Sequence, residues 1–369
     1  MLMRLLEHPL YQREIAAVAE LPLNWDSLRG KRFVISGATG MIGHFLIDVL
    51  MHQNAAADLQ CRIYALGRNA EKAHSFFQEY SENQSFQFVP WNFWDVPYLK
   101  PVDYVLHLAS TTHPRAYASQ PIDTILLNVQ GLGNLLEAAC RSETKRFLFA
   151  SSCEIYGDPI DDTPFTEQSC GYIDCNTLRA GYPEGKRTGE ALCQAYLAQE
   201  GLDVVIPRFS RTYGPTMLPS DTKAISQFIK KGVAREDIVL KSEGKQIYSY
   251  SHVADAVSGL LYCLLSGKKG EAYNIASGSI RMKELAQAAA DCVGSRVVFQ
   301  LPEAVEKSGY SVVKRSIQDT AKLELLGWKP MYPIDQGIRE TVEILTDVWK
   351  GNEVADEENP SAPVPHISQ

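Results

Sequence analysis

Residues 31–43, KRFVISGATGMIG, place three closely spaced glycines between an apolar strand and a helix. The predicted strand covers residues 33–35, and the glycines are Gly37, Gly40 and Gly43. A strand, a glycine turn and a helix in this order let the backbone approach a pyrophosphate, whose charge lies at the helix N-terminus. A glycine triplet alone could be a tight turn and nothing more, but this context predicts a dinucleotide-binding fold.

Apolar strand candidates alternate with helical patterns through about residue 215. They cover residues 33–36, 62–66, 86–90, 104–108, 146–150 and 204–208. This alternation predicts an α/β protein with a doubly wound parallel sheet of the Rossmann type. We expect an N-terminal extension (1–29) followed by a mainly Rossmann dinucleotide-binding domain (30–210). A smaller C-terminal α/β lobe, mainly 211–345, is expected to bind substrate. The acidic, proline-rich tail (351–369) is expected to be disordered. The chain is expected to cross between domain and lobe.

Composition restricts the class of protein. A chain of 369 residues with 45% hydrophobic side chains can bury a large core. No stretch is apolar enough to span a membrane, and acidic residues interrupt the first twenty positions, so we expect a cytoplasmic protein. A net charge of −8 leaves no basic stripe for nucleic acid. The eight cysteines lack CxxC spacing, so we expect free thiols and no metal site.

A second pattern, Ser152 followed later by Tyr182 and Lys186, indicates hydride-transfer chemistry. Tyr182 and Lys186 lie four positions apart on one predicted helix, so the ammonium would lie beside the phenol and lower its pKa. Tyr182 could then exchange a proton with a substrate hydroxyl that Ser152 orients. This spacing also occurs on many solvated helices, and the glycine turn upstream is what favours a shared site.

With these motifs the chain resembles the extended short-chain dehydrogenase/reductase superfamily, over roughly residues 30–345, and within it the NAD-dependent epimerase/dehydratase family. The nearest resemblance is to the UDP-glucuronate decarboxylase (UDP-xylose synthase) branch. The resemblance is carried by HLASTTHPRAYASQP at 107–121, SSCEIYGDP at 151–159, RAGYPEGKRTGEALC at 179–193 and LLGWKP at 325–330. It implies a nucleotide-sugar substrate, bound NAD or NADP, and a homodimer.

The reaction that the resemblance implies starts with oxidation at C4 of the sugar. Tyr182 would take the hydroxyl proton, hydride would pass to the nicotinamide and later return, and Lys186 would also bind the nicotinamide ribose. Glu154 would act on the sugar ring beyond C4, as a base or by positioning it, although a carboxylate at a strand end can also bond to local backbone. A 4,6-dehydratase, a 4-epimerase, an NADPH-dependent keto-sugar reductase and a non-catalytic dinucleotide-binding protein stay as alternatives to the decarboxylase.

The resemblance extends to individual contacts. Besides Tyr182 and Lys186, the implied cofactor contacts are Gly37, Thr39, Gly40, Met41, Ile42, Gly43, Arg68, Asn92, Phe93, Leu108, Ala109, Ser110, Asn128 and Arg208. The substrate-binding candidates are Thr111, Pro114, Tyr117, Arg179, Arg211, Tyr248 and Arg315.

Two departures from the family pattern bear on ligand choice. Members that prefer NAD carry an acidic residue after the second strand, whereas Gly67 and Arg68 stand here. An arginine can pair with the 2′-phosphate of NADP, or it can simply face solvent. On the substrate side, Arg211, Thr216 and Tyr248 replace an asparagine and two arginines, so the usual anion clamp is changed. The cations that could rebuild it are Arg211, Lys223, Lys245 and Arg315.

Overall fold

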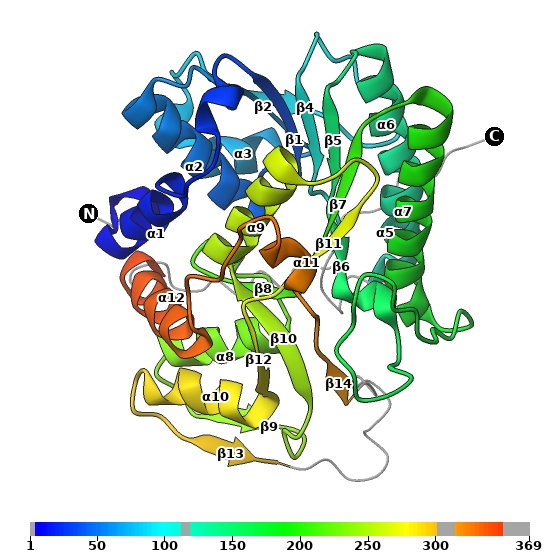
Figure 1. Ribbon diagram of the computed structural model, residues 1–369. Helices are drawn as coiled ribbons and strands as arrows, with labels where there is room; N and C mark the ends of the chain where they lie inside the picture. The colour runs from blue at the N-terminus through cyan, green and yellow to red at the C-terminus, as the bar shows by residue number, and fades with distance from the viewer. Residues whose placement is uncertain (1–3, 112–118, 301–313, 350–369) are drawn as a thin grey trace, which may run out of the picture.

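The computed structural model describes residues 4–111, 119–300 and 314–349, and the protein folds around a twisted parallel sheet (Figure 1). In the described residues the strands of this sheet are β1 (Arg32–Ser36), β2 (Arg62–Gly67), β3 (Phe86–Pro90), β4 (Tyr104–His107), β5 (Arg146–Phe149), β6 (Ser151–Ser152), β7 (Val204–Phe209) and β11 (Ala272–Ile275). Their order is β3-β2-β1-β4-β5-β7-β11, with β6 beside β7, and every pairing is parallel. The order reverses between β1 and β4, where doubly wound sheets bind ligands. The predicted α/β Rossmann fold is confirmed.

The six predicted strands correspond to β1–β5 and β7, each to within one residue at either end. The seventh strand on this path, β11, was not predicted, because its four residues are a short apolar run inside the region assigned to the lobe. The chain reaches β11 by crossing back from the lobe to the main sheet. The predicted tail at 351–369 lies outside the described residues.

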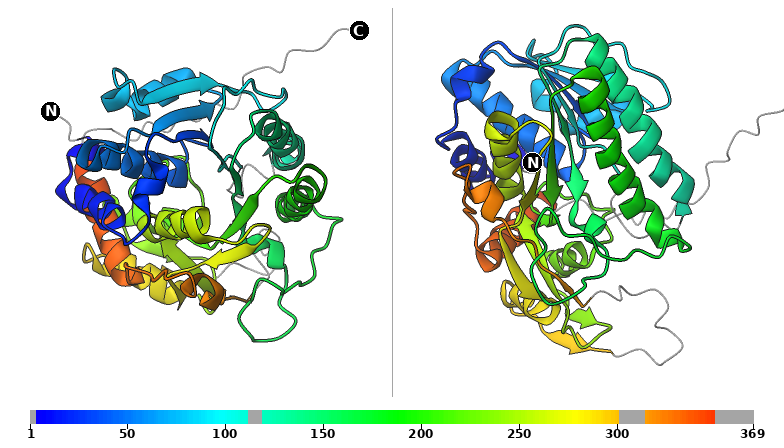
Figure 2. Two further views of the ribbon diagram at one scale, coloured as in Figure 1. Left: turned by 45° about the horizontal axis from the view of Figure 1, so that its top comes forward. Right: turned by 45° about the vertical axis from the view of Figure 1, so that its right-hand side comes forward.

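Helices cover both faces of the main sheet (Figure 2). One face carries α2 (Met41–Ala57), α3 (Ala70–Phe76) and α9 (Val253–Ser266), whose apolar side chains share one core with the sheet. The other face carries α5 (Pro121–Leu126), the π-helical turn η4 (Leu127–Gly131), α6 (Leu132–Arg141) and α7 (Gly181–Glu200). The helices cover the two faces of the sheet and leave the end formed by the carboxyl ends of the strands uncovered by these helices.

The C-terminal lobe lies at that end of the sheet (Figure 1). Its strands are β8 (Arg211–Tyr213), β9 (Ile238–Leu240), β10 (Ile247–His252), β12 (Gly278–Arg281), β13 (Val297–Phe299) and β14 (Arg315–Ser316). Its helices are α8 (Ala224–Val233), α10 (Met282–Asp291) and α12 (Ile334–Trp349), while α11 (Ala321–Glu324) packs against β11. Short helical turns are η1 (Leu5–Glu7), η2 (Trp25–Leu28), η3 (Gln78–Tyr80), η5 (Cys153–Tyr156) and η6 (Leu178–Ala180). Among the helices described, none is long and apolar enough to cross a membrane.

Helix α1 (Pro9–Ala19), from the N-terminal extension, packs against α2, α9 and α12. Its Tyr11 hydroxyl donates a hydrogen bond to Asp48 Oδ2 at 2.5 Å, and Tyr80 donates to Asp48 Oδ1 at 2.9 Å. Arg13 reaches α12, where its Nη2 lies 2.8 Å from a carboxylate oxygen of Glu340. The extension therefore ties the Rossmann domain to the lobe.

Burial raises the pKa of Asp48 to about 7.

We expect Asp48→Asn to remove a pH dependence of stability. Because the folded state holds the proton of Asp48 more tightly than the unfolded state, with its ordinary pKa of 3.8, this stability is present at low pH and lost as pH rises through about 7. Between pH 5 and pH 8, urea unfolding should show the wild type losing up to about 3 kcal/mol relative to the variant. The exposed Asp162→Asn serves as control, and equal pH profiles for all three proteins would contradict the assignment.

Candidate active site

The glycine turn between β1 and α2 packs directly on the end of β4. Gly37 has φ +73°, and a Cβ atom there would lie 2.6 Å from the Ala109 backbone nitrogen, so only glycine fits. Helix α2 begins at Met41, and the residue before it, Gly40, offers no side-chain cap. The first-turn N–H groups are therefore left for an anion.

Two adjoining cavities open beside this turn. The larger, of about 500 Å³, extends from the glycine turn to the end of β2 and the start of α3. The smaller, of about 200 Å³, extends to Ser152, Tyr182 and Lys186. They share lining residues, among them Gly37 and Lys223, so they form one cleft. A glycine cradle, a bare helix N-terminus and an adjoining cleft are features that fit a dinucleotide.

Helix α7 carries Tyr182 and Lys186 to the smaller cavity. A Cβ atom at Gly189 would lie 2.6 Å from the Phe149 ring, so glycine there lets the helix lie directly on β5. The helix ends at Glu200, and the next residue, Gly201, adopts the left-handed conformation at φ 72°. This close packing buries both Tyr182 and Lys186 at the carboxyl ends of β5 and β6.

Burial dominates the protonation of this pair. Lys186 Nζ donates a hydrogen bond to the Ala150 carbonyl at 2.7 Å and lies 4.7 Å from the Phe149 ring centroid. Burial lowers the pKa of Lys186 to about 7. Burial also raises the pKa of Tyr182, which a hydrogen bond with Ser152 partly offsets. The expected lowering of the Tyr182 pKa by Lys186 was therefore wrong for this structure, because desolvation disfavours both charged forms.

Glu154 follows Ser152 in the tight turn η5. The Ser152 hydroxyl accepts a hydrogen bond from the Glu154 backbone N–H at 3.2 Å. The Glu154 carboxylate lies between two arginines, with Nη2 of Arg179 at 3.0 Å and Nη2 of Arg211 at 3.4 Å. Its side chain thus pairs with guanidinium groups, in contrast to the alternative of a carboxylate bonded to local backbone.

The residues that replace the family's anion clamp have structural contacts here. The Thr216 hydroxyl donates to the Met41 carbonyl at 2.9 Å and ties the lobe to the start of α2. The Tyr248 ring lies under the Arg211 guanidinium, at 3.9 Å from centroid to guanidinium carbon. Lys223 pairs with Asp221 and lines both cavities, whereas Lys245 is exposed and pairs with Glu243.

The structure brings most of the predicted site residues to this cleft. The predicted cofactor contacts that line it are Gly37, Thr39, Gly40, Met41, Ile42, Gly43, Arg68, Phe93, Leu108, Ala109, Ser110, Tyr182 and Lys186. The other predicted residues that line it are Ser152, Glu154, Thr111 and Arg211. Those that line neither cavity are Asn92, Asn128, Arg179, Arg208, Tyr248 and Arg315. Pro114 and Tyr117 lie outside the described residues. Lining shows position, and the roles stay predictions.

Three of the predicted cofactor contacts are engaged elsewhere. Asn92 is exposed and accepts a hydrogen bond from the Trp94 backbone at 3.1 Å, which stabilises a turn. Asn128 is fully buried behind the cleft and accepts from the Ser110 hydroxyl at 3.0 Å, so it supports a lining residue. The side chain of Arg208 belongs to a separate polar network.

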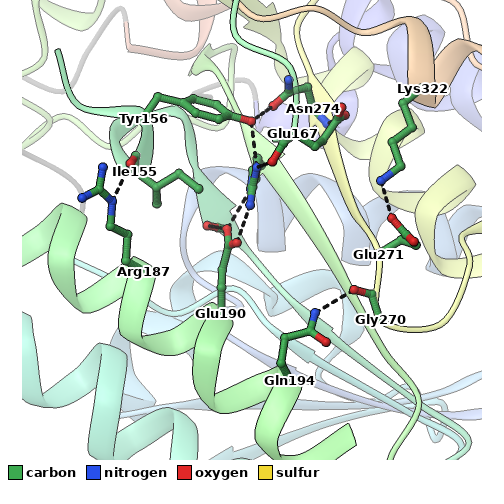
Figure 3. A network of polar contacts seen from close by, with 12 residues as sticks. Ile155, Tyr156, Glu167, Arg187, Glu190, Gln194, Gly270, Glu271, Asn274 and Lys322 are labelled. Carbon is green, nitrogen blue, oxygen red and sulfur yellow. Dashed lines mark hydrogen bonds and ion pairs between the residues drawn. The ribbon is translucent and has the colours of Figure 1, made fainter. Parts of the chain in front are cut away.

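This network joins α7 to β7 and β11 (Figure 3). Arg208 donates two hydrogen bonds to the Glu190 carboxylate, at 2.9 and 2.6 Å. It also donates to the Tyr156 hydroxyl at 3.0 Å, and Tyr156 in turn donates to Asn274 Oδ1 at 2.6 Å. Glu190 further accepts from the Ser151 hydroxyl at 2.5 Å. The same carboxylate therefore holds the helix of Lys186 and the strand end beside Ser152.

The sequence reasoning missed Lys72 and Glu190. Lys72 lines the larger cavity together with Arg68, four residues before it, and its Nζ lies 5.3 Å from the Phe76 ring centroid. Glu190 lies four residues after Lys186 on the same helix. For Glu190 the available signal was its spacing of four from Lys186 on one helix, since such side chains share a face. For Lys72 the spacing gave no such signal, because Arg68 precedes α3 and only the fold brings the two side chains to one cavity.

A sequence model of the NAD dependent epimerase/dehydratase family matches residues 33–276. UDP-glucuronic acid decarboxylase 2 of Arabidopsis thaliana is 32% identical over 311 residues, which cover 84% of this chain and 67% of that protein. UDP-glucuronic acid decarboxylase 1 of Danio rerio is 31% identical over 319 residues, which cover 86% of this chain and 73% of the relative.

Solved structures share the fold. A dTDP-glucose 4,6-dehydratase from Streptomyces venezuelae, with NAD and TYD bound, superposes with a TM-score of 0.74 at 24% identity and covers 86% of this chain and 98% of its own. A UDP-glucuronic acid 4-epimerase from Bacillus cereus, with UDP-glucuronic acid and NAD, gives a TM-score of 0.72 at 20% identity, covering 86% and 99%.

We expect Glu190→Gln to destabilise the protein by roughly 3 kcal/mol, because it leaves the buried Arg208 charge without its carboxylate. The matched control is Glu184→Gln on the same helix, which removes a more exposed pair with Arg187 and should cost about 0.5 kcal/mol. Urea unfolding of both variants measures the difference. Equal, small losses would show that the Glu190 pair contributes no more than a surface contact.

Proposed function

Because the chain belongs to the NAD dependent epimerase/dehydratase family, we propose that it is a UDP-glucuronate decarboxylase that oxidises the sugar at C4 and returns the hydride before release. The observation that carries this proposal is one cavity lined by Ser152, Glu154, Tyr182 and Lys186, continuous with the cleft that fits a dinucleotide. The relatives named UDP-glucuronic acid decarboxylase, at 32% and 31% identity, support this reaction within the family.

In the proposed reaction the bound nicotinamide supplies a reversible acceptor for the C4 hydride. Tyr182 removes the C4 hydroxyl proton, and Ser152 hydrogen-bonds the same oxygen to fix its geometry. When Lys186 is protonated, its positive charge stabilises the Tyr182 phenolate. Since burial brings the pKa of Lys186 to about 7, an approaching anion or ribose hydroxyl decides whether this lysine is charged at neutral pH.

The carbon dioxide step needs no additional oxidant. Once C4 is a ketone, the carboxylate on C5 belongs to a β-keto acid, so its carbon–carbon bond can break and release carbon dioxide. The electron pair forms an enolate, and Ser152 and Tyr182 stabilise its oxygen. C5 then takes a proton and C4 returns to an alcohol. The sum is UDP-glucuronate plus a proton giving UDP-xylose and carbon dioxide, with the cofactor unchanged.

Alternatives from the same family share the oxidation at C4. A 4,6-dehydratase would lose water, and a 4-epimerase would return the hydride to the opposite face. An NADPH-dependent keto-sugar reductase is favoured by Arg68 and Lys72, which line the cleft at the end of β2 and the start of α3. The alternative of a non-catalytic dinucleotide-binding protein does not explain why Ser152, Tyr182 and Lys186 line one cavity.

We expect the purified protein, incubated with NAD or NADP and UDP-glucuronate, to yield UDP-xylose without net consumption of cofactor. Mass spectrometry of the products measures this directly. Tyr182→Phe should lower the rate at least about 100-fold because the proton acceptor is lost, while the thermal midpoint stays close to that of the wild type. Loss of water from a UDP- or dTDP-hexose would instead establish a dehydratase. Stoichiometric oxidation of NADPH with a keto-sugar would establish a reductase.

We propose NADP as the preferred cofactor, because Arg68 and Lys72 provide two cations where a 2′-phosphate would lie. Burial lowers the pKa of Lys72, and the Arg68 charge lowers it further, as expected for two cations that share a site. Calorimetric titration should show NADP binding about tenfold tighter than NAD, and Arg68→Ala should remove this preference. Arg62→Ala, an exposed residue at the opposite end of β2, is the control. A wild type that binds NAD at least as tightly as NADP would exclude this choice.

A further inference from the structure

Arg211 lies where a substituent of the proposed substrate would enter the smaller cavity. It comes from β8, whose neighbour β10 supplies the Tyr248 ring that lies 3.9 Å from the guanidinium carbon. Its side chain is 20% exposed and lines the cavity together with Ser152 and Tyr182. The ring fixes the plane of the guanidinium, so its edge can face a planar anion.

The contacts of Arg211 leave hydrogen-bonding capacity for a ligand. Its Nη2 lies 3.4 Å from Glu154 Oε1 and its Nη1 lies 3.8 Å from Cys153 Sγ. The contact with Glu154 is longer than the 2.7–2.9 Å of a strong charge-assisted hydrogen bond, and the thiol sulfur of Cys153 is only a weak acceptor. Glu154 has its shorter contact, 3.0 Å, with Arg179, which does not line the cavity. A guanidinium with five N–H donors is therefore held in place without being fully used.

The local charges favour an anion. One carboxylate, Glu154, faces two guanidinium groups, so the cluster carries one excess positive charge. The neighbouring Lys223 is paired with Asp221 and adds no net charge. A second carboxylate, brought by the ligand, would balance the cluster, whereas a neutral sugar would leave one partly buried cation without a carboxylate of its own.

We propose that Arg211 binds the carboxylate of an acidic sugar and thereby selects a uronic acid nucleotide over its neutral hexose counterpart. This inference rests on the proposed function, since it places a nucleotide sugar with its C4 at Tyr182. The guanidinium edge would accept the carboxylate in a bidentate contact, and Tyr248 acts as a positioning residue that keeps the guanidinium plane fixed.

The test compares UDP-glucuronate with UDP-glucose by calorimetric titration in the presence of NADP or NAD. The Tyr182→Phe protein is the background, so that neither nucleotide sugar is converted during the titration. We expect UDP-glucuronate to bind at least about tenfold tighter than UDP-glucose. Arg211→Met should abolish this preference while changing the UDP-glucose affinity less than about threefold, and Arg211→Lys should keep part of it because it keeps the charge. Arg281→Met, at an exposed ion pair on β12, controls for the loss of one positive charge.

The outcomes separate the inference from the proposed function. Equal affinities for the two nucleotide sugars in the Tyr182→Phe protein overturn the inference and leave a nucleotide-sugar enzyme in place. An equal loss of both affinities in Arg211→Met also overturns it, because that result assigns Arg211 to the diphosphate. Failure to bind either nucleotide sugar overturns the proposed function itself. If Arg211→Met does not fold by circular dichroism, Arg211→Lys decides, since a preference equal to that of the background protein contradicts a bidentate contact.

Discussion

The buried ion pair between Glu190 and Arg208 is the interaction on which the geometry of the site depends. Glu190 lies one helical turn beyond Lys186, and it also accepts a hydrogen bond from Ser151, next to Ser152. Arg208 extends the contact to Tyr156 and, through it, to Asn274 on β11. A single carboxylate thus contacts both the helix that carries Lys186 and the strand end that carries Ser152. Two charges buried in this way are tolerated because each finds several partners.

Burial governs the protonation of Tyr182 and Lys186, whereas ion pairs surround Glu154. Tyr182 and Lys186 are desolvated, which raises the pKa of Tyr182 and lowers the pKa of Lys186 to about 7, so the phenol stays neutral while the lysine is balanced between its two forms at neutral pH. On the other side of the cavity Glu154 keeps its charge partners, with one arginine at the rim and Arg211 in the wall. The site therefore combines a desolvated tyrosine–lysine pair with a carboxylate that lies between two arginines.

Local patterns were sufficient for much of this protein. The strands β1 to β5 and β7 are short apolar runs between turn signals. The glycine turn predicts a close backbone contact, which Gly37 makes with Ala109. Arg208 illustrates the limit. Its position at a strand end resembles a cofactor contact, but its side chain turns away because the Glu190 carboxylate attracts it beneath the sheet. A side chain's direction depends on partners that are distant in sequence.

By itself, the sequence determined the doubly wound sheet and the glycine cradle, because hydrophobic periodicity and turn chemistry act over a few residues. A motif, and not periodicity, predicted that Ser152 meets Tyr182 and Lys186, which line one cavity in the structure. Only the tertiary structure decided that Tyr248 supports Arg211, that Thr216 fastens the lobe to Met41, and that burial brings the pKa of Lys186 to about 7. These features come from segments brought together by packing, and the desolvation that packing causes cannot be read from neighbouring residues in the chain.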